Sequence, residues 1–149
     1  MDEEKLNRLP ADVKKQFVKL AEKLTEKKQK TKVHDDFLTF VKHVWPEFIE
    51  GAHHKKIAEK FNDIANKKIK RLIINMPPRH TKSEFASFLL PAWMVGRRPN
   101  LKIIQSTHTT ELAIRFGRKA KTLMDSQEYK EVFDTRLRED SQAAGKWET

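Results

Sequence analysis

The sequence predicts an α/β fold, in which a mostly parallel β-sheet carries helices on both faces and is preceded by N-terminal helices. The run 72–75 is short, β-branched and without the regular polar alternation of half-exposed strands, and residues 101–106 are predicted as a second buried strand. A helical pattern follows each run, and parallel strands are joined by such helical crossovers. The length of 149 residues is that of one domain.

The first predicted helix covers residues 12 to about 29. Apolar residues recur there at helical spacing, with lysines and glutamates on the other face. The lysine-rich stretch 26–32 has no apolar periodicity, so we interpret it as a frayed helix end or a linker. We therefore divide the chain into an N-terminal helix with a basic linker, residues 1–33, and a folded domain, residues 34–149.

Two shorter helices are predicted next. The second helix, residues 36–44, has Asp35 or Asp36 as its N-cap and ends at Trp45, because the following proline disfavours helical backbone. The third helix has an apolar face at helical spacing and leads into the first strand, 72–75. That face consists of His54, Ile57, Ala58, Phe61, Ile64 and Ala65.

A loop separates the first predicted strand from the helix after it. Residues 76–81 cannot continue the strand, because Pro77 and Pro78 remove two consecutive backbone donors. A helical pattern begins at once, and Pro91 predicts a kink or a stop in that helix. Its inner face is formed by Phe85, Phe88 and Leu89.

The second strand, 101–106, precedes a helix that Thr109 or Thr110 caps and that ends near residue 125. A further helix is possible over residues 127–133. The remaining residues are mixed in charge and contain no third strong strand. Because two strands cannot close a parallel sheet, we expect the sheet to be incomplete in this chain.

Composition narrows the classes of partner. The chain has 31 Lys and Arg against 21 Asp and Glu, a formal charge of +10, which favours a polyanionic partner such as nucleic acid or nucleotide. A merely solvated surface is the alternative. The absence of cysteine excludes disulfides and thiolate metal sites. No apolar run is long enough to span a bilayer, so we expect a soluble, unexported protein without a membrane partner.

The sharpest chemical pattern is the end of the loop, where Lys82 and Ser83 stand at a helix start. Phosphate groups require inward backbone N–H groups, a helix N-terminus, a lysine and a hydroxyl for Mg²⁺. Met76 and Thr81 occupy the two positions where the usual phosphate-binding loop has glycine. A β-branched residue such as Thr81 resists positive φ. An ordinary strand-to-helix loop is therefore the alternative.

This region resembles a known family. The run Pro77-Pro78-Arg79-His80-Thr81-Lys82-Ser83, followed by Leu90-Pro91-Ala92-Trp93 and Arg98-Pro99, is similar to the deviant Walker A region of tailed-phage terminase large subunits. Gly51-Ala52-His53-His54 and the segment from Glu111 to Arg118 also match. The resemblance covers roughly residues 37 to 133.

The resemblance implies a P-loop NTPase domain of the ASCE type, a three-layer parallel sheet with flanking helices, followed by an RNase H-like nuclease domain. Family members form a ring at the capsid portal and use ATP hydrolysis to drive double-stranded DNA into the capsid. The implied cofactors are ATP and Mg²⁺. The implied partners are double-stranded DNA, the terminase small subunit, the portal and further copies of the chain, in the cytoplasm of the host cell.

The resemblance also implies roles for single residues. Lys82 holds the β- and γ-phosphates, and Ser83 binds Mg²⁺ through its hydroxyl. Arg79 senses or stabilises the γ-phosphate, unless it pairs with a surface carboxylate. Arg115 and Arg118 are equal candidates for an arginine that reaches the nucleotide of a neighbouring subunit, although a solvated or DNA-facing helix surface explains them equally well. The ATP-binding loop is completed by Pro77, Pro78, His80 and Thr81.

Two residues fall in the segment that, in the family, surrounds the adenine. They are His54 and Trp45, and a buried aromatic or a capping histidine is the alternative for either. The histidines of the chain lack the spacing of a zinc site. No acidic Mg²⁺ ligand after a later strand and no water-orienting glutamate is recognisable, so we expect this chain alone to neither turn over ATP nor cut DNA.

Two other functions compete with a motor ATPase. The charge and the basic stretch 55–71 fit a non-enzymatic DNA-binding module, which would bind duplex DNA with a steep salt dependence and ignore ATP. The chain could also be a truncated relic that folds poorly.

Overall fold

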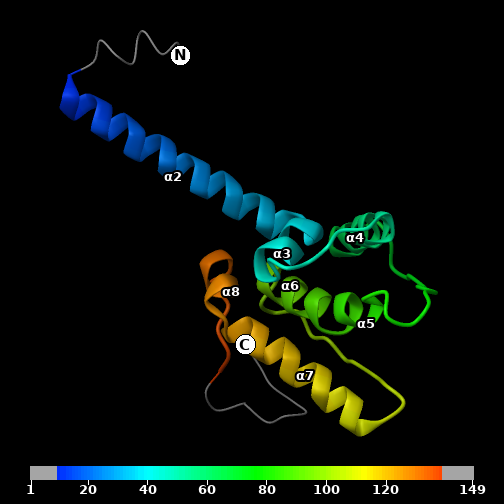
Figure 1. Ribbon diagram of the computed structural model, residues 1–149. Helices are drawn as coiled ribbons and strands as arrows, with labels where there is room; N and C mark the ends of the chain where they lie inside the picture. Colours follow the sequence, from blue (N-terminus) through cyan, green and yellow to red (C-terminus); the bar gives the residue numbers. More distant parts are fainter. Residues whose placement is uncertain (1–9, 139–149) are drawn as a thin grey trace. The chain divides into compact units, whose positions relative to one another are not determined.

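The structure is a computed structural model that describes residues 10–138. All regular secondary structure within that range is helical (Figure 1). The helices are α2 (Ala11–Asp35), α3 (Phe37–Val44), α4 (Ala52–Ala65), α5 (Lys82–Glu84), the π-helix η1 (Phe85–Leu89), α6 (Leu90–Arg97), α7 (Thr110–Asp125) and α8 (Gln127–Val132).

The predicted α/β sheet is wrong for the described residues. The two segments predicted as strands, 72–75 and 101–106, form no strand. Both are extended connections, and they leave Ile73 85% exposed and Ile104 96% exposed. Leu72 and Ile74 pack instead against the helical core. Strand formation requires backbone partners on a neighbouring strand, and neither run forms such a pairing with any described residue.

The chain divides into two compact units, Met1–Thr31 and Lys32–Thr149. Helix α2 crosses this division, so the lysine-rich stretch 26–32 is helical rather than a linker. Asp12 in its first turn and Lys32 in its last turn suit the helix dipole. Within the first unit, the apolar face of the helix is about half exposed, as the values for Val13, Phe17, Leu20 and Leu24 show.

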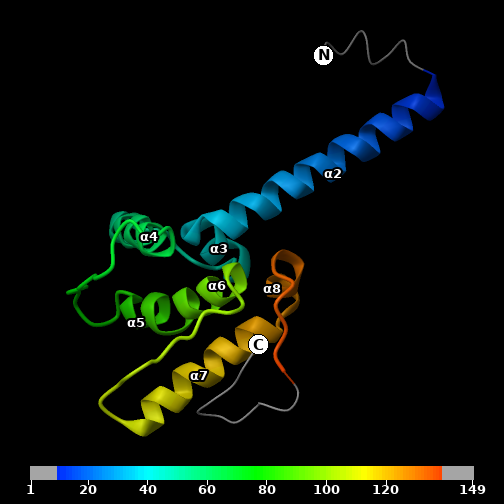
Figure 2. The same cartoon turned by 180° about the vertical axis from the view of Figure 1, so that it is seen from behind.

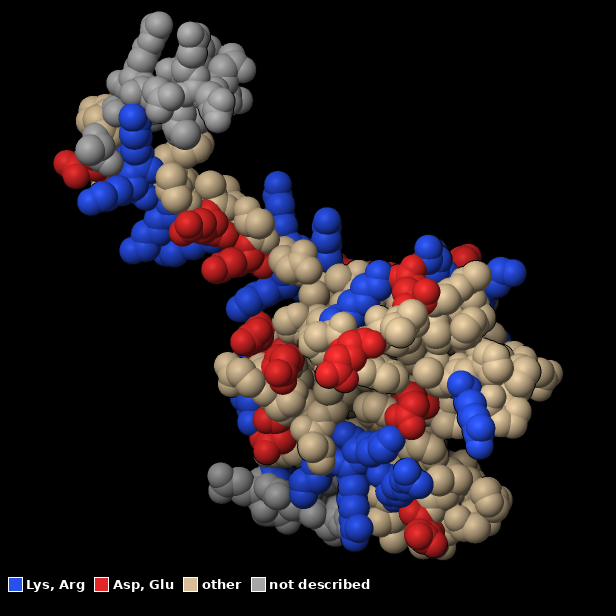
Figure 3. All heavy atoms as spheres, in the orientation of Figure 1, with Lys and Arg blue, Asp and Glu red and all other residues tan. Residues whose placement is uncertain are grey.

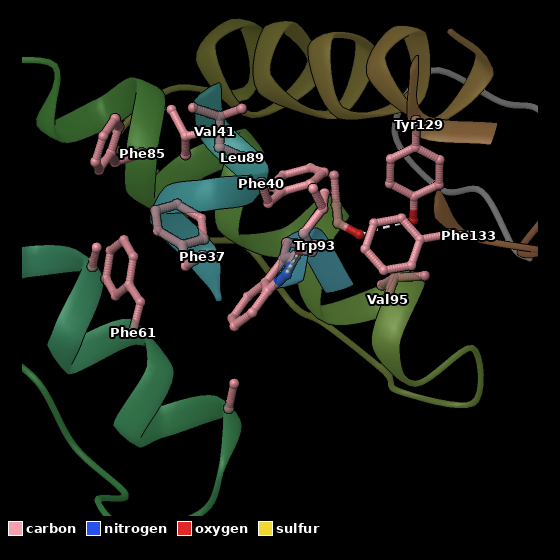
Figure 4. Packing of buried hydrophobic residues seen from close by; sticks show 14 of the residues in the cluster. Phe37, Phe40, Val41, Phe61, Phe85, Leu89, Trp93, Val95, Tyr129 and Phe133 are labelled. Carbon is pink, nitrogen blue, oxygen red and sulfur yellow. Dashed lines mark hydrogen bonds between the residues drawn. The ribbon is translucent and has the colours of Figure 1, made fainter. Parts of the chain in front are cut away.

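The core of the second unit is aromatic. Helix α3 lies between α4 and α8 (Figure 1; Figure 2) and also contacts α6. Its Phe37 is fully buried, and the rings of Phe61, Phe85 and Trp93 meet it edge to face at 5.0–5.4 Å (Figure 4). Such ring pairs stabilise by about 0.5–1.5 kcal/mol beyond their buried area. This cluster joins α3, α4, η1 and α6 around one centre.

The capping predictions agree with the structure. Asp36 is the N-cap of α3, and its side chain accepts a hydrogen bond from the Thr39 N–H. Thr109 is the N-cap of α7 and accepts from the Leu112 N–H. Both helices therefore begin at the capping residues that the sequence indicated.

Pro91 does not end its helix. Helices α5, η1 and α6 follow one another without a break from Lys82 to Arg97. Proline cannot donate to the helix, and its ring clashes with a carbonyl one turn earlier. The backbone widens to π geometry just before Pro91, where the Leu90 N–H donates to the Phe85 carbonyl. This widening is how the helix accommodates the proline.

Candidate functional site

The candidate loop leads directly into a helix. Residues 78–81 form turns and bends between the extended segment 71–77 and α5. The first backbone bond of this helix runs from the Phe85 N–H to the Thr81 carbonyl, at 2.9 Å. The N–H groups of Lys82, Ser83 and Glu84 precede that bond, so they lie at the positive end of the helix dipole without intrahelical partners.

Two residues of the loop have left-handed backbone. Arg79 has φ 64° and Thr81 has φ 56°. Thr81 is also the N-cap of α5, with ψ 8°. The structure thus places Thr81 in a conformation that its branched side chain was expected to resist. Left-handed backbone costs an L-residue about 1–2 kcal/mol, so other interactions must stabilise Thr81.

Local hydrogen bonds order the loop. The Thr81 hydroxyl donates to the His80 carbonyl at 2.7 Å, and His80 Nδ1 lies 2.8 Å from the Pro78 carbonyl. Lys82 Nζ lies 3.4 Å from the Met76 carbonyl, which is long for a hydrogen bond. Lys82 is half-buried, whereas Arg79 and Ser83 are exposed. The ammonium group therefore lies over the loop without a strong partner among the described residues.

His54 reaches the loop from α4. It is 5% exposed and packs against the rings of Phe48 and Phe85. Its Nδ1 accepts from the Gly51 N–H at 2.8 Å, and its Nε2 lies 2.7 Å from Thr81 Oγ1. Both ring nitrogens and most of the ring surface are thus already in use. The expected contact between His54 and adenine stays a prediction, and the contacts of His54 favour the alternative of a capping histidine.

Burial lowers the pKa of His54, and the neighbouring His53 and His80 lower it further, while Glu50 opposes them. The rings of His53 and His54 lie 3.8 Å apart, and those of His53 and His80 lie 5.7 Å apart. His53 Nε2 is buried without a hydrogen-bond partner in the described part of the chain. Among the described residues, no group of three or more His, Asp or Glu side chains is placed to hold a metal ion.

The two arginines predicted to reach a neighbouring subunit's nucleotide do not line the same surface as the loop. Arg115 and Arg118 are exposed on α7 and line an open groove of about 990 Å³. Its other lining residues include Phe88 and Lys119, but none of the loop residues 77–83. The expected trans role of the arginines therefore stays a prediction, and nothing in the described geometry separates the two. Trp45, the other expected adenine neighbour, packs against Phe48.

One ion pair connects the arginine-bearing helix with the loop helix. Lys119 Nζ lies 2.9 Å from a carboxylate oxygen of Glu84, one residue after Ser83. The same ammonium group lies 5.1 Å from the centre of the Phe88 ring. Sequence reasoning missed this pair and the bond from His54 to Thr81, because their partners are 35 and 27 residues apart and no local pattern indicates such contacts.

Comparison with known protein families, with curated proteins and with solved structures found no match. No helix in the described residues is long and apolar enough to cross a membrane.

Proposed function

We propose that the loop from Pro77 to Ser83 binds the phosphate groups of ATP with Mg²⁺. The observation that carries this proposal is the left-handed backbone at Thr81, directly before Lys82. It turns the chain at the N-cap, where no side chain caps the helix, so the first-turn N–H groups are available to bind an anion. Left-handed residues within a turn also form anion-binding concavities, and Arg79 adds a second such residue.

The donor set of the loop fits a nucleotide phosphate. Lys82 supplies a cation at the start of the helix, and Ser83 supplies an exposed hydroxyl suited to Mg²⁺. Arg79, also exposed, is the arginine of this loop, and its guanidinium group would pair with the outermost phosphate. Bound Mg²⁺ would neutralise phosphate charge. The chain's own contribution is to hold and orient the phosphates.

We further propose that this loop belongs to a viral DNA-packaging motor of the terminase large-subunit kind. The support is the order and spacing of the motifs from Gly51 to Arg118. In that role ATP hydrolysis would move double-stranded DNA into a capsid through a ring of subunits at the portal, with a small subunit as partner. Hydrolysis would need residues that we do not recognise in this chain, so binding is the activity we assign to it.

The test is titration of the chain with a fluorescent ATP analogue in the presence of Mg²⁺. Lys82→Ala should weaken binding at least tenfold, because charge-assisted contacts to phosphate contribute about 1.5–3 kcal/mol each. Lys102→Ala is the matched control, since Lys102 is exposed outside the loop. Equal affinity of the Lys82 variant and the unmodified chain would refute the assignment of the loop.

A basic DNA-binding module remains the second candidate. Figure 3 shows lysines and arginines spread over the surface among acidic residues, with several gathered over the part that contains α7. Arg115 and Arg118 are among the exposed residues of that helix. This function predicts duplex binding that weakens steeply with salt and is indifferent to ATP. Affinity for duplex DNA measured at several salt concentrations, with and without ATP, separates the two candidates.

A further inference from the structure

We propose that His54 is a positioning residue that holds Thr81 in its left-handed conformation and thereby keeps the loop open to phosphate. The proposal rests on the proposed function and adds the residue on which the loop depends. It concerns a residue 27 positions before Thr81, on a different helix. It also explains how a threonine can stand where the usual phosphate-binding loop has glycine.

The hydrogen bonds fix the direction of each donor. A backbone N–H such as that of Gly51 can only donate, so His54 Nδ1 is the acceptor and carries no proton. Neutral imidazole then has its proton on Nε2, which donates to Thr81 Oγ1 at 2.7 Å. The Thr81 hydroxyl keeps its own proton for the His80 carbonyl, also at 2.7 Å. Every donor in this chain of bonds has one acceptor.

The histidine itself is held firmly. The bond from Gly51 is part of the N-terminal cap of α4, where His54 is the third residue of the helix. The rings of Phe48 and Phe85 lie 4.8 Å and 5.1 Å from the His54 ring. Phe85 belongs to the same continuous helix as Lys82. His54 therefore links the start of α4 to the start of the loop helix, with little freedom to move.

The physical need for such a link comes from Thr81. Glycine adopts left-handed backbone at no steric cost, whereas a β-branched residue is an outlier there. Without the bond to His54, the Thr81 backbone would relax toward the common region and move the N–H groups of Lys82 and Ser83. Phosphate affinity should thus depend on His54 only while residue 81 is threonine. That dependence separates positioning from a general role in folding.

The main experiment is a double-mutant cycle read by affinity for the fluorescent ATP analogue with Mg²⁺. His54→Phe keeps a ring against Phe48 and Phe85 but removes both nitrogens. It should weaken binding about tenfold, the equivalent of the two ordinary hydrogen bonds that are lost. Thr81→Gly sets the reference affinity of the second background, because it removes both the β-branched side chain and the acceptor of the His54 bond. In the Thr81→Gly background, His54→Phe should change affinity by less than about twofold.

Two conservative variants test the direction of the bonds. His54→Gln can still present an N–H near the place of Nε2, toward Thr81, whereas His54→Asn can present an oxygen near Nδ1, toward Gly51. Glutamine should therefore retain most of the affinity and asparagine should not. His53→Phe is the matched control, because it keeps a ring beside His54 and His80, while His53 Nε2 has no hydrogen-bond partner to lose among the described residues. It should leave affinity within about twofold.

Nitrogen NMR of the histidine rings provides a readout without nucleotide. The His54 signals should report a neutral ring protonated on Nε2, and Thr81→Val should shift the Nε2 signal by removing its acceptor. A ring protonated on Nδ1, or an unchanged signal in Thr81→Val, would overturn the inference. So would an equal loss of affinity from His54→Phe in both backgrounds. If the unmodified chain binds no ATP analogue, the proposed function fails instead, whatever the ring signals show.

Discussion

At the scale of single residues, hydrogen bonds from side chains decide how backbone segments begin and turn. Asp36 is the second example after Thr81. Its carboxylate accepts from the Thr39 N–H and hydroxyl at 2.8 and 2.6 Å, and from Asn62 Nδ2 at 2.8 Å. Asn62 in turn accepts from the Phe37 N–H at 2.9 Å. One carboxylate thereby caps α3 and attaches it to α4.

Asp36→Ala should lower the free energy of unfolding by about 1–2 kcal/mol, because it removes the N-cap of α3 and leaves Asn62 without its acceptor. Urea unfolding followed by tryptophan fluorescence measures the change. Asp36→Asn is the control, since asparagine is also a good N-cap, and it should cost less. A cost below about 0.3 kcal/mol for the alanine variant would contradict this role.

The same carboxylate predicts a dependence of stability on pH. Burial raises the pKa of Asp36, but hydrogen bonds from Thr39 and Asn62 and the charge of Lys42 outweigh it, so the pKa lies below the ordinary value. A folded-state pKa below the unfolded one contributes stability that is complete above about pH 4 and is lost as pH falls through the folded pKa. The difference between the unmodified chain and Asp36→Ala should shrink in that acidic range.

At the scale of elements, close contact between α6 and α8 fixes the C-terminal part of the second unit. The Tyr129 hydroxyl donates to the Ala92 carbonyl at 2.9 Å, and burial raises the pKa of Tyr129 well above its ordinary value. Phe133, directly after α8, packs on Phe40 and Tyr129 (Figure 4). A Cβ atom at Gly96 would lie 2.6 Å from the Phe133 ring. The approach of the two helices therefore requires glycine.

Gly96→Ala should destabilise the second unit by about 1–2 kcal/mol. Alanine favours a helix over glycine by about 1 kcal/mol, but overpacking against a buried ring costs about 1–3 kcal/mol, and two rings adjoin this position. Thermal unfolding measures the net effect. In a Phe133→Leu background the cost of Gly96→Ala should fall, because the smaller side chain leaves space. Stabilisation by Gly96→Ala alone would show that α8 moves away freely.

At the scale of the whole molecule, the buried apolar residues of the core, within the described range 10–138, all lie at or after Val33. The division at Thr31 therefore separates a helical segment with an exposed apolar face from a unit that holds every core residue the structure describes. Trp93 in that core donates to the His34 carbonyl at 3.0 Å, so the last turn of α2 belongs with the second unit.

A chain of residues 32–149 should fold by itself, because none of the removed residues that the structure describes is buried in the core. We expect a cooperative thermal transition, with a midpoint within about 5 °C of that of the full chain. Near-ultraviolet circular dichroism of the aromatic cluster measures it. A chain of residues 40–149 is the contrasting variant, since it lacks Val33 and Phe37 and should not unfold cooperatively. Loss of the transition in both would contradict the division.

The sequence by itself determined the local features of this protein. The N-caps at Asp36 and Thr109, the apolar face of α4 and the helix after the proline-rich loop follow from short-range propensities and spacing, because a helix satisfies its backbone with neighbours three and four residues away. The position of Lys82 and Ser83 at a helix start could likewise be predicted, because that prediction needs only the order of residues.

Only the tertiary structure decided the features that depend on distant partners. The runs 72–75 and 101–106 predicted strands, but a strand exists only with a neighbour beside it, and the described chain supplies none. The left-handed backbone at Thr81 likewise depends on His54, which the fold of α4 brings to it. Propensity sets what a segment can adopt alone, whereas pairing and strain are settled by residues far away in the sequence.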